Sequence, residues 1–408
     1  MKIIHKGFTF RLLPDKKTEN LFRQYAGCCR LIWNLALEME KTALEKGTKF
    51  LGYHALCDQL MVWKGRKEPK EEAKVFPFLA DVHSQILQQR LKDLGQAVKR
   101  FRESETVGFP KFKRRGRDDS FRYPQGFKLD EGNSCIYLPK IGWVRYKKSR
   151  DIQGTPKNVT VSLEADHWYV SILAEIESPD PVHPSQEAVG LDAGVVRLLT
   201  LSDGSFIVPI DALRKYEEKI ASLQQELSRK EKGSSNYKKV QARIAKIYDK
   251  VANTRKDYLH KVTTEISRKF GIVVIENLLV RNMTRSAKGT VEEPGHNVKA
   301  KSGLNKAILD QGWYELRRQL AYKLDWLGGK LIVVPPQYTS QTCSRCGHKD
   351  KNNRPTQEQF KCTSCGFELN ADHNAALNIL AAGRAVITDG SGELSLPREA
   401  GTTQGSNR

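Results

Sequence analysis

The chain has 408 residues, of which 39% are hydrophobic and 28% are charged, and its 68 Lys and Arg outnumber 47 Asp and Glu. No apolar run approaches membrane-spanning length, which argues against a transmembrane protein and leaves a globular chain of roughly two to four domains. The formal net charge of +21 favours a polyanionic partner, nucleic acid above all, over a merely solubilising basic surface. The opening MKIIHKGFTFRLLP lacks the apolar segment of a secretory signal, so we expect a cytoplasmic protein.

The N-terminal residues alternate apolar and polar side chains through about residue 13, which predicts a strand. Residues 17–101 follow a helical pattern, with an apolar stripe at its end formed by Leu87, Leu91, Leu94, Val98 and Phe101. The opposite face of that helix is rich in amides, which suit contacts with base edges, although a solvated face explains them equally well. It carries Ser84, Gln85, Gln88, Gln89 and Arg90.

A basic segment, GFPKFKRRGR, occupies residues 108–117, where Pro and Gly break any helix. Phe109 and Phe112 stand among its cations, so the loop could follow a phosphate backbone and stack a base. A solvated run of charge is the alternative. The cations are Lys111, Lys113, Arg114, Arg115 and Arg117. Short alternating runs over residues 137–177 then predict an antiparallel barrel or sheet, and residues 177–187 predict a linker.

The second half begins with a buried strand and a hairpin closed at Asp203 and Gly204. Residues 211–270 predict an antiparallel pair of charged helices, and residues 271–278 predict a short buried strand. We expect a mobile loop at 281–303, one helix at 305–327 and a strand in KLIVVPP. The cysteine-rich segment and a last helix follow, and the Gly- and Ser-rich tail 388–408 is expected to be disordered.

Four cysteines form two pairs, CSRC and CTSC, with fifteen residues between them. This spacing is typical of a structural zinc ribbon, in which four thiolates close a tetrahedron and leave no position for a catalytic water. The predicted ligands of one Zn²⁺ are Cys343, Cys346, Cys362 and Cys365. The scattered Cys28, Cys29, Cys57 and Cys135 are expected to be buried thiols.

Three acids stand at the ends of elements: two end apolar strands, where a carboxylate is costly unless it is paired or binds a metal ion, and one starts a helix. Asp192 ends the apolar strand AVGLD, Glu276 ends IVVIE, and Asp372 opens the last helix. Each alone could be a satisfied structural carboxylate, and Asp372 could cap its helix. Together they fit a cluster that binds Mg²⁺, and two such ions support phosphodiester cleavage. The order strand, hairpin, helices, strand, helix, strand, helix is that of an RNase H-like fold.

Several motifs in order, GLDAGVV, IENL, SQTCSRCG, FKCTSCG and NADHNAALNI, resemble those of the TnpB family. The segments FTFRLLPDKKTENLFRQYAGCCRLIWN and VGFPKFKRRG are also similar to that family, so the resemblance spans about residues 5–385. Members of the family are RNA-guided DNA endonucleases encoded by insertion sequences and related to type V CRISPR effectors.

The resemblance implies a multidomain α+β protein. Its RNase H-like nuclease domain of RuvC type (residues 184–340 and 367–387) would contain an inserted zinc ribbon (341–366). A wedge-like β-barrel (1–15 and 104–183) would contain a helical recognition domain (16–103). Asp192, Glu276 and Asp372 would be catalytic and hold two Mg²⁺. The partners would be a guide RNA from the transposon end and double-stranded target DNA, in a monomeric ribonucleoprotein without membrane contact.

Other roles follow only by analogy. Tyr53 and the helix face of Ser84, Gln85 and Gln88 are candidates for reading a short motif beside the target. The family often has Asp-Arg-Asp-x-Asn where this chain has NADHN at 370–374, so an auxiliary Asp or Arg is missing. Asn374 and Asn378 could brace the carboxylate or a phosphate, or simply lie on the helix surface. A nuclease-dead repressor and a transposase are the rival functions.

Overall fold

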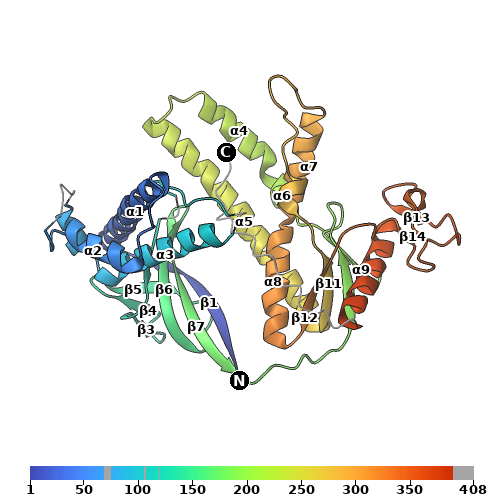
Figure 1. Cartoon of the computed structure of the whole chain (residues 1–408), viewed down its shortest axis with the longest axis horizontal. Helices are drawn as coiled ribbons and strands as arrows, with labels where there is room; N and C mark the ends of the chain where they lie inside the picture. Colours follow the sequence, from blue (N-terminus) through green and yellow to red (C-terminus); the bar gives the residue numbers. More distant parts are fainter. Residues whose placement is uncertain (69–74, 105–106, 118, 389–408) are drawn as a thin grey trace. The chain divides into compact units, whose positions relative to one another are not determined.

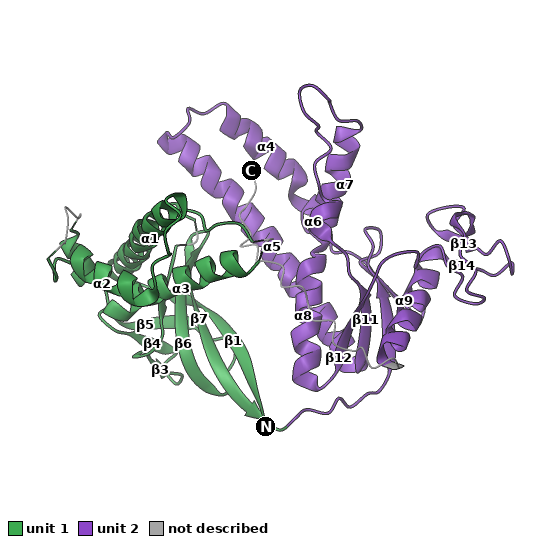
Figure 2. Ribbon diagram, viewed as in Figure 1, with its two compact units in different colours: residues 1–179, 398–408 green, residues 180–397 purple. Residues whose placement is uncertain are grey.

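The computed structural model describes residues 1–68, 75–104, 107–117 and 119–388. The chain divides into two compact units, one formed by residues 1–179 and the other by residues 180–397 (Figure 2). Most of the predicted tail lies outside the described residues. None of the described helices combines the length and the apolar character that crossing a membrane requires.

The first unit is built on an antiparallel sheet with the strand order β2-β6-β7-β1-β5-β4-β3. Phe8, Phe10 and Leu12 are buried on alternate positions of β1, so one face of the sheet is apolar. Among the described strands, β2 and β3 end this order unpaired with each other, so the predicted barrel is a half barrel. The strands are β1 (Lys2–Leu13), β2 (Ser120–Tyr123), β3 (Lys128–Asp130), β4 (Cys135–Leu138), β5 (Gly142–Lys147), β6 (Thr155–Glu164) and β7 (His167–Ser178).

Helices cover the apolar face of this sheet (Figure 1). The ring of Phe22 lies 5.1 Å from that of Trp168, so helix and sheet share one core, and the predicted stripe on α3 is buried in it. Because that core is continuous, the division into a barrel and a recognition domain stays a prediction. The helices are α1 (Lys16–Glu45), α2 (Tyr53–Trp63), the 3-10 turn η1 (Pro77–Ala80) and α3 (Ser84–Glu103).

The second unit contains a mixed five-stranded sheet with the order β10-β9-β8-β11-β12. The predicted hairpin forms its antiparallel part, and β8, β11 and β12 run parallel. Parallel strands end at the same edge of a sheet, so the last residues of β8 and β11 lie side by side. The strands are β8 (Ala188–Asp192), β9 (Leu199–Leu201), β10 (Phe206–Ile207), β11 (Ile272–Glu276) and β12 (Lys330–Val334).

This sheet is covered on both faces, which explains why its parallel strands are apolar throughout. Val273 and Ile275 face α5 (Ser235–Lys269) and α8 (Trp313–Leu327), whereas Val274 faces α9 (Ala371–Thr388) (Figure 1). A Cβ at Gly190 would lie 2.2 Å from the carbonyl oxygen of Ala376. Glycine at this position of β8 is therefore what lets α9 pack directly on the strand.

The predicted helical pair is confirmed as α4 (Glu217–Ser228), preceded by the turn η2 (Arg214–Tyr216), and the long helix α5. The single helix expected at 305–327 is wrong, because the chain forms α7 (Val298–Gln311) and α8. They are separated at Gly312, whose φ of +69° is left-handed and cannot continue a helix.

The mobile loop predicted at 281–303 is also partly structured. It begins in α6 (Val280–Met283), makes a bridge between Gly289 and Pro294, and continues into α7. Lys301 donates to the Met283 carbonyl at 2.7 Å and holds α7 against α6. Polar composition misled the prediction here, because side-chain to backbone bonds order this segment.

Candidate functional site

The three predicted acids come from three elements of the second unit. Leu191 pairs with Ile275 in register, so the next residues, Asp192 and Glu276, leave adjacent parallel strands at the same edge. Asp372 lies in the first turn of α9, which packs across β8. The negative charges of Glu276 and Asp372 both act on Asp192, so the structure brings all three acids into one electrostatic neighbourhood.

Asp192 is the most perturbed of the three. Burial, the largest cause, and the charges of Glu276 and Asp372 raise its pKa to about 7, against the opposing effect of Arg354. Burial also raises the pKa of Glu276, although Thr339 partly offsets this by donating its hydroxyl at 2.6 Å. Among the described residues, none donates a hydrogen bond to the Asp192 carboxylate. Such a costly arrangement is typical of a site that binds a cation.

Arg354 was not predicted as a site residue. It lies in the cysteine-rich segment, and its guanidinium is 3.5 Å from Asp372 Oδ1 while it also donates to the Gln357 carbonyl at 2.6 Å. Arg354, eighteen positions before Asp372, thus brings a guanidinium to an acid whose neighbouring family arginine is missing from the 370–374 segment. No sequence motif marks it, because its role depends on how the cysteine-rich segment folds against α9.

The helix cap of α9 is Asn370. Its Oδ1 accepts hydrogen bonds from the backbone amides of Asp372 and His373 at 3.1 and 3.2 Å. The alternative reading of Asp372 as the cap is therefore wrong. Its carboxylate is left to face Arg354 and Asp192.

Asn374 and Asn378 bind the segment that leads into the first cysteine pair. Asn374 is fully buried, accepts from the Ser344 amide at 3.0 Å and donates to the Thr342 carbonyl at 2.8 Å. Asn378 donates to the carbonyls of Thr339 and Thr342. Thr339 also donates to Glu276, so these two amides support the acidic site indirectly, through the backbone of residues 339–344. The sequence had suggested direct contact with the carboxylate or a phosphate, or a position on the helix surface, and neither describes this arrangement.

The cysteine-rich segment contains the turn η3 (Lys351–Asn353) and the hairpin of β13 (Gln359–Lys361) and β14 (Glu368–Asn370). Its four cysteines place their sulfurs within 4.8 Å of one another, with 3.8 Å between Cys343 and Cys365 and 3.6 Å between Cys346 and Cys362. A tetrahedron with Zn–S bonds of about 2.3 Å has edges of about 3.8 Å, so the donor set fits zinc. Among the described residues, no other group of three or more His, Cys, Asp and Glu is gathered tightly enough to hold an ion.

The basic loop of the first unit is anchored to α1. Trp33 donates to the Lys111 carbonyl at 3.1 Å, and Asn34 exchanges two hydrogen bonds with the backbone of Lys113. Lys113 also places its ammonium 4.7 Å from the centroid of the Trp33 ring. The loop therefore has a defined backbone from which the other cations project into solvent. The exposed ones are Lys111, Arg114, Arg115 and Arg117.

The predicted readers of a DNA motif lie on neighbouring helices of the same unit. Tyr53, the first residue of α2, is 38% exposed, and Ser84 is exposed at the start of α3. Gln85 and Gln88 are half-buried on α3, so part of each amide remains accessible. Gln89 and Arg90 are engaged within the protein, with Asp93 and Ser120 respectively.

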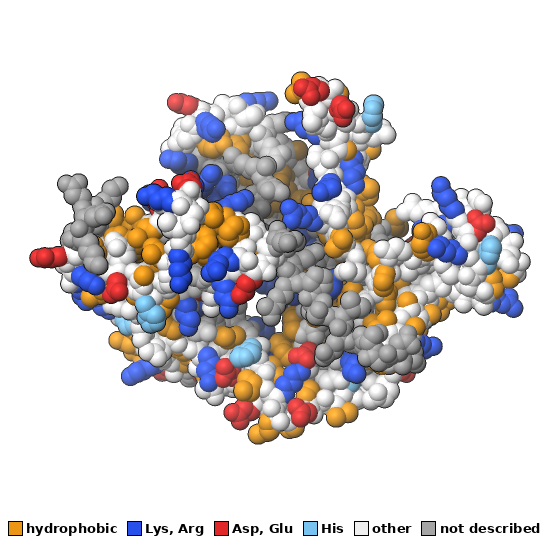
Figure 3. All heavy atoms as spheres, in the orientation of Figure 1, with side chains coloured by type: hydrophobic (Ala, Val, Ile, Leu, Met, Phe, Trp, Pro, Cys, Tyr) orange, Lys and Arg blue, Asp and Glu red, His pale blue; other side chains and the backbone are white. Residues whose placement is uncertain are grey.

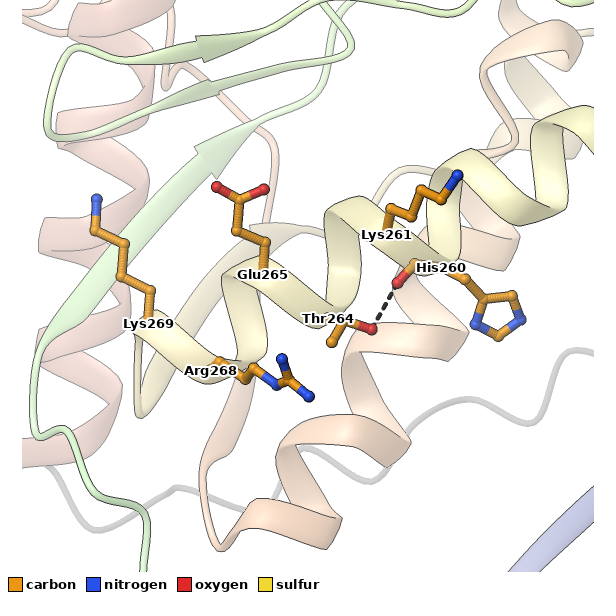
Figure 4. Close-up of a pocket in the computed structure, with 6 residues that line it drawn as sticks. All are labelled: His260, Lys261, Thr264, Glu265, Arg268 and Lys269. Atoms are coloured by element: carbon orange, nitrogen blue, oxygen red, sulfur yellow. Dashed lines mark hydrogen bonds between the residues drawn. The ribbon is translucent and has the colours of Figure 1, made fainter. Parts of the chain in front are cut away.

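The surface has two further features. On the face drawn in Figure 3, Lys and Arg side chains outnumber acidic ones and are spread over the surface. A shallow hollow lies along α5, between His260 and Lys269 (Figure 4). Its lining residues all come from that single helix, so we read it as a solvated helix face.

Asp192 provides a test of the electrostatic account. We expect Asp192→Asn to raise the melting temperature of the second unit at pH 8 in magnesium-free buffer without chelator. The gain should shrink as the pH falls toward 5. A rise of the Asp192 pKa from 3.8 to about 7 corresponds to at most about 4 kcal/mol of folding free energy, since a tenfold change in an equilibrium is about 1.4 kcal/mol. Differential scanning calorimetry measures the effect.

The sign follows from proton binding. A folded-state pKa of about 7 lies above the ordinary value of 3.8, so the native state binds the proton more tightly than the unfolded chain. Stability is therefore lost as pH rises from about 4 to 7. Asp203→Asn is the matched control: burial raises the pKa of Asp203, but bonds from Ser205 and Lys269 lower it overall. It should be neutral or destabilising at pH 8, and a gain there equal to that of Asp192→Asn would contradict the account.

The sequence and the fold match known proteins. Family models match at residues 171–287 ("Probable transposase"), 313–379 ("Cas12f1-like, TNB domain") and 1–49 ("Helix-turn-helix domain"). The last of these segments forms β1 and the long helix α1. A solved structure, "Cryo-EM structure of the Cas12f1-sgRNA-target DNA complex", aligns over 92% of this chain and 98% of its own with a TM-score of 0.50. At 16% identity this likeness shows the fold alone, a mixed α+β chain of the Cas12 effector type.

The sequence relatives are closer. The chain is 50% identical to "Putative RNA-guided DNA endonuclease InsQ" of Escherichia coli K12, over 94% of this chain and 94% of that protein. It is 32% identical to "Putative RNA-guided DNA endonuclease" of Streptomyces pristinaespiralis, over 96% of this chain and 92% of that protein. The chain therefore belongs to the TnpB family, as its motifs predicted.

Proposed function

We propose that this protein is a transposon-encoded, RNA-guided DNA endonuclease whose cleavage site is formed by Asp192, Glu276 and Asp372. The observation that carries the proposal is the meeting of these acids around Asp192, whose pKa is raised to about 7. Half of the residues are identical to a relative described as an RNA-guided DNA endonuclease, and the fold resembles an effector solved with guide RNA and target DNA.

The sheet order supports a nuclease domain of RuvC type, because an antiparallel trio followed by two parallel strands is the RNase H-like arrangement. We assign that domain to residues 184–340 and 367–387, with the ribbon at 341–366 inserted ahead of α9. The wedge and the recognition helices would then lie in the first unit.

The donor chemistry of the acidic site fits Mg²⁺, which prefers carboxylate oxygens. Bound there, two ions would supply an activated water and stabilise the leaving oxygen of the phosphodiester. Asp192 and Glu276 would hold them from the strand ends and Asp372 from α9. These acids lie less tightly together than the four cysteines.

The surrounding residues have distinct tasks. Thr339 holds Glu276 in place through its hydroxyl, and Asn378 holds the Thr339 carbonyl. Arg354 can exchange Asp372 for a non-bridging oxygen of the scissile phosphate, since guanidinium groups bind both anions in similar geometry. Without substrate, Arg354 would neutralise Asp372; with substrate bound, it would orient the scissile phosphate.

Recognition would be divided between the RNA and the protein. Pairing with a guide RNA from the transposon end would read the target, and the protein would read a short adjacent motif and the shape of the heteroduplex. Lys111, Lys113, Arg114, Arg115 and Arg117 of the anchored loop are candidates for phosphate contacts, and Tyr53, Ser84, Gln85 and Gln88 for the motif.

A direct experiment separates this function from its rivals. We expect RNA that co-purifies with the protein to derive from the flanking transposon end, and the complex to cleave a randomised plasmid library carrying the matching target. Sequencing of the RNA and of the cut ends measures both. Joined products would favour a transposase, and retention of the target without any cutting would favour a repressor.

A further inference from the structure

A pocket of about 470 Å³ opens beside Glu276, at the edge where β11 and β12 end. Asn277 directly follows Glu276, and Gln337 is two residues before Thr339, which donates to Glu276. Residues of α6 and α8 complete the lining. The pocket shares the end of β11 and the segment after β12 with the acidic site but contains none of its three acids. It lies on the α8 face of the sheet, where Arg317 bonds to Asn277, whereas Glu276 continues the α9 face of Val274.

The walls of the pocket are held by hydrogen bonds. The Asn277 amide donates to the Val334 carbonyl at 2.8 Å, and Met283 donates to the Leu279 carbonyl at 3.1 Å. Arg317 donates from Nη1 to Asn277 Oδ1 at 2.9 Å. A guanidinium can only donate, so Oδ1 is the atom of the Asn277 amide that accepts this bond. The Nδ2 group of Asn277 therefore points away from Arg317 and can donate to a ligand.

The lining combines apolar walls with a polar rim. Leu278, Met283 and Pro336 supply the walls, while Asn277, Gln337 and Arg317 supply hydrogen-bonding groups. A phosphate would fit poorly, because Arg317 is the one cation among the described lining residues and already bonds to Asn277. A flat heterocycle with an apolar face and a polar edge matches this chemistry, and the volume accommodates one nucleotide.

We propose that this pocket binds one unpaired nucleobase of the DNA strand that is cut, from a nucleotide that crosses the end of β11 between the acidic site and the α8 face. The inference rests on the proposed function, since it takes that strand to be the ligand. A base held here would be turned out of its stack, at a cost that the apolar walls offset. A paired base could not enter the pocket.

The first test uses substrates with a single abasic residue placed in turn at each position around the cut. We expect the complex of protein and co-purified RNA to cut one of them about tenfold more slowly than intact DNA, because one base contact is lost. Leu279→Trp, which places a large ring at the 47%-exposed lip, should slow cutting of intact DNA and abolish that position dependence. Leu309→Trp, at an exposed leucine of α7 outside the pocket, is the matched control and should behave as the wild type.

Two results would overturn the inference: equal cutting of intact and abasic substrates, and crosslinks that fall only outside the pocket. If the wild type cuts intact and abasic substrates equally at every position, the pocket holds no base although the endonuclease stands. If no DNA is cut at all, the endonuclease fails and a second arm decides on the pocket alone. In that arm, single-stranded DNA carrying 5-iododeoxyuridine is irradiated with the complex and the crosslinked peptides are sequenced. Crosslinks at 277–283 or 335–337 that disappear in Leu279→Trp support the pocket, and crosslinks only elsewhere refute it.

Discussion

Asp192→Asn, Glu276→Gln and Asp372→Asn, each made alone, will abolish DNA cleavage and leave guide RNA bound. Each change keeps the size of the side chain and removes the negative charge that would hold Mg²⁺. We expect a loss of about 10³-fold or more, since metal ions contribute several kcal/mol of transition-state stabilisation. Cleavage of a labelled target by the RNA-loaded protein measures the effect, and filter binding measures RNA retention.

The stability of these variants makes the result interpretable. Asp192→Asn should lose cleavage while gaining stability at pH 8, because the same burial that raises its pKa destabilises the charged form. If cleavage were lost because the variant misfolds, its melting temperature at pH 8 would fall instead. Asp203→Asn, in the hairpin turn of the same sheet, should cut normally. Residual cutting near the wild-type rate by any of the three variants would refute the assignment of that residue.

Removal of the zinc site will have the second large effect. We expect about one zinc per chain in the purified protein, as one tetrahedral four-thiolate site binds one ion. Cys346→Ser should lose that zinc, unfold the ribbon and abolish cleavage, since structural zinc contributes about 10–16 kcal/mol to the folding of such modules. Elemental analysis, calorimetry and the cleavage assay measure the three consequences.

The route from the ribbon to the acids explains why cleavage should fail. Asn374 binds Ser344 and Thr342 beside the first cysteine, Asn378 binds Thr342 and Thr339, and Thr339 binds Glu276. Release of the ribbon frees this segment and removes Arg354 from Asp372. Cys135→Ser, outside the cluster, should keep both zinc and cleavage. A folded, cleaving protein without zinc would contradict the ribbon and its coupling to the site.

Local patterns carried much of the fold. β1, α3, β8 and β11 could be predicted because the number of faces that an element buries determines the spacing of its apolar residues. β1 and α3 bury one face each and show periodic apolar positions, whereas β8 and β11 bury both faces and are apolar throughout. The helix boundary at Gly312 was missed because a single glycine inside a helical pattern is often tolerated. A Cβ at Gly312 would also lie 3.1 Å from side-chain atoms of Arg255 and Leu259, a long-range contact that composition does not encode.

The site was predicted unevenly for a related reason. Asp192 and Glu276 were marked by the energetic cost of an acid that ends an apolar strand, and the cysteines by a spacing that metal geometry imposes. No such signal identified Arg354, because arginines are common in polar segments. Its role becomes visible only when the cysteine-rich segment packs against α9. Asn370, and not Asp372, proved to be the helix cap, since both positions suit a cap and backbone geometry chooses between them.

The sequence by itself therefore determined the family and predicted the roles of the four cysteines and the three acids, because each is marked by a short motif whose chemistry constrains residue type and spacing. Only the tertiary structure decided how these parts act together. It brought the charges of Glu276 and Asp372 to bear on Asp192, set Arg354 against Asp372 and joined the ribbon to Glu276 through Asn374, Asn378 and Thr339. Those relations depend on contacts between residues far apart in the chain, which arise when strands pair and helices pack.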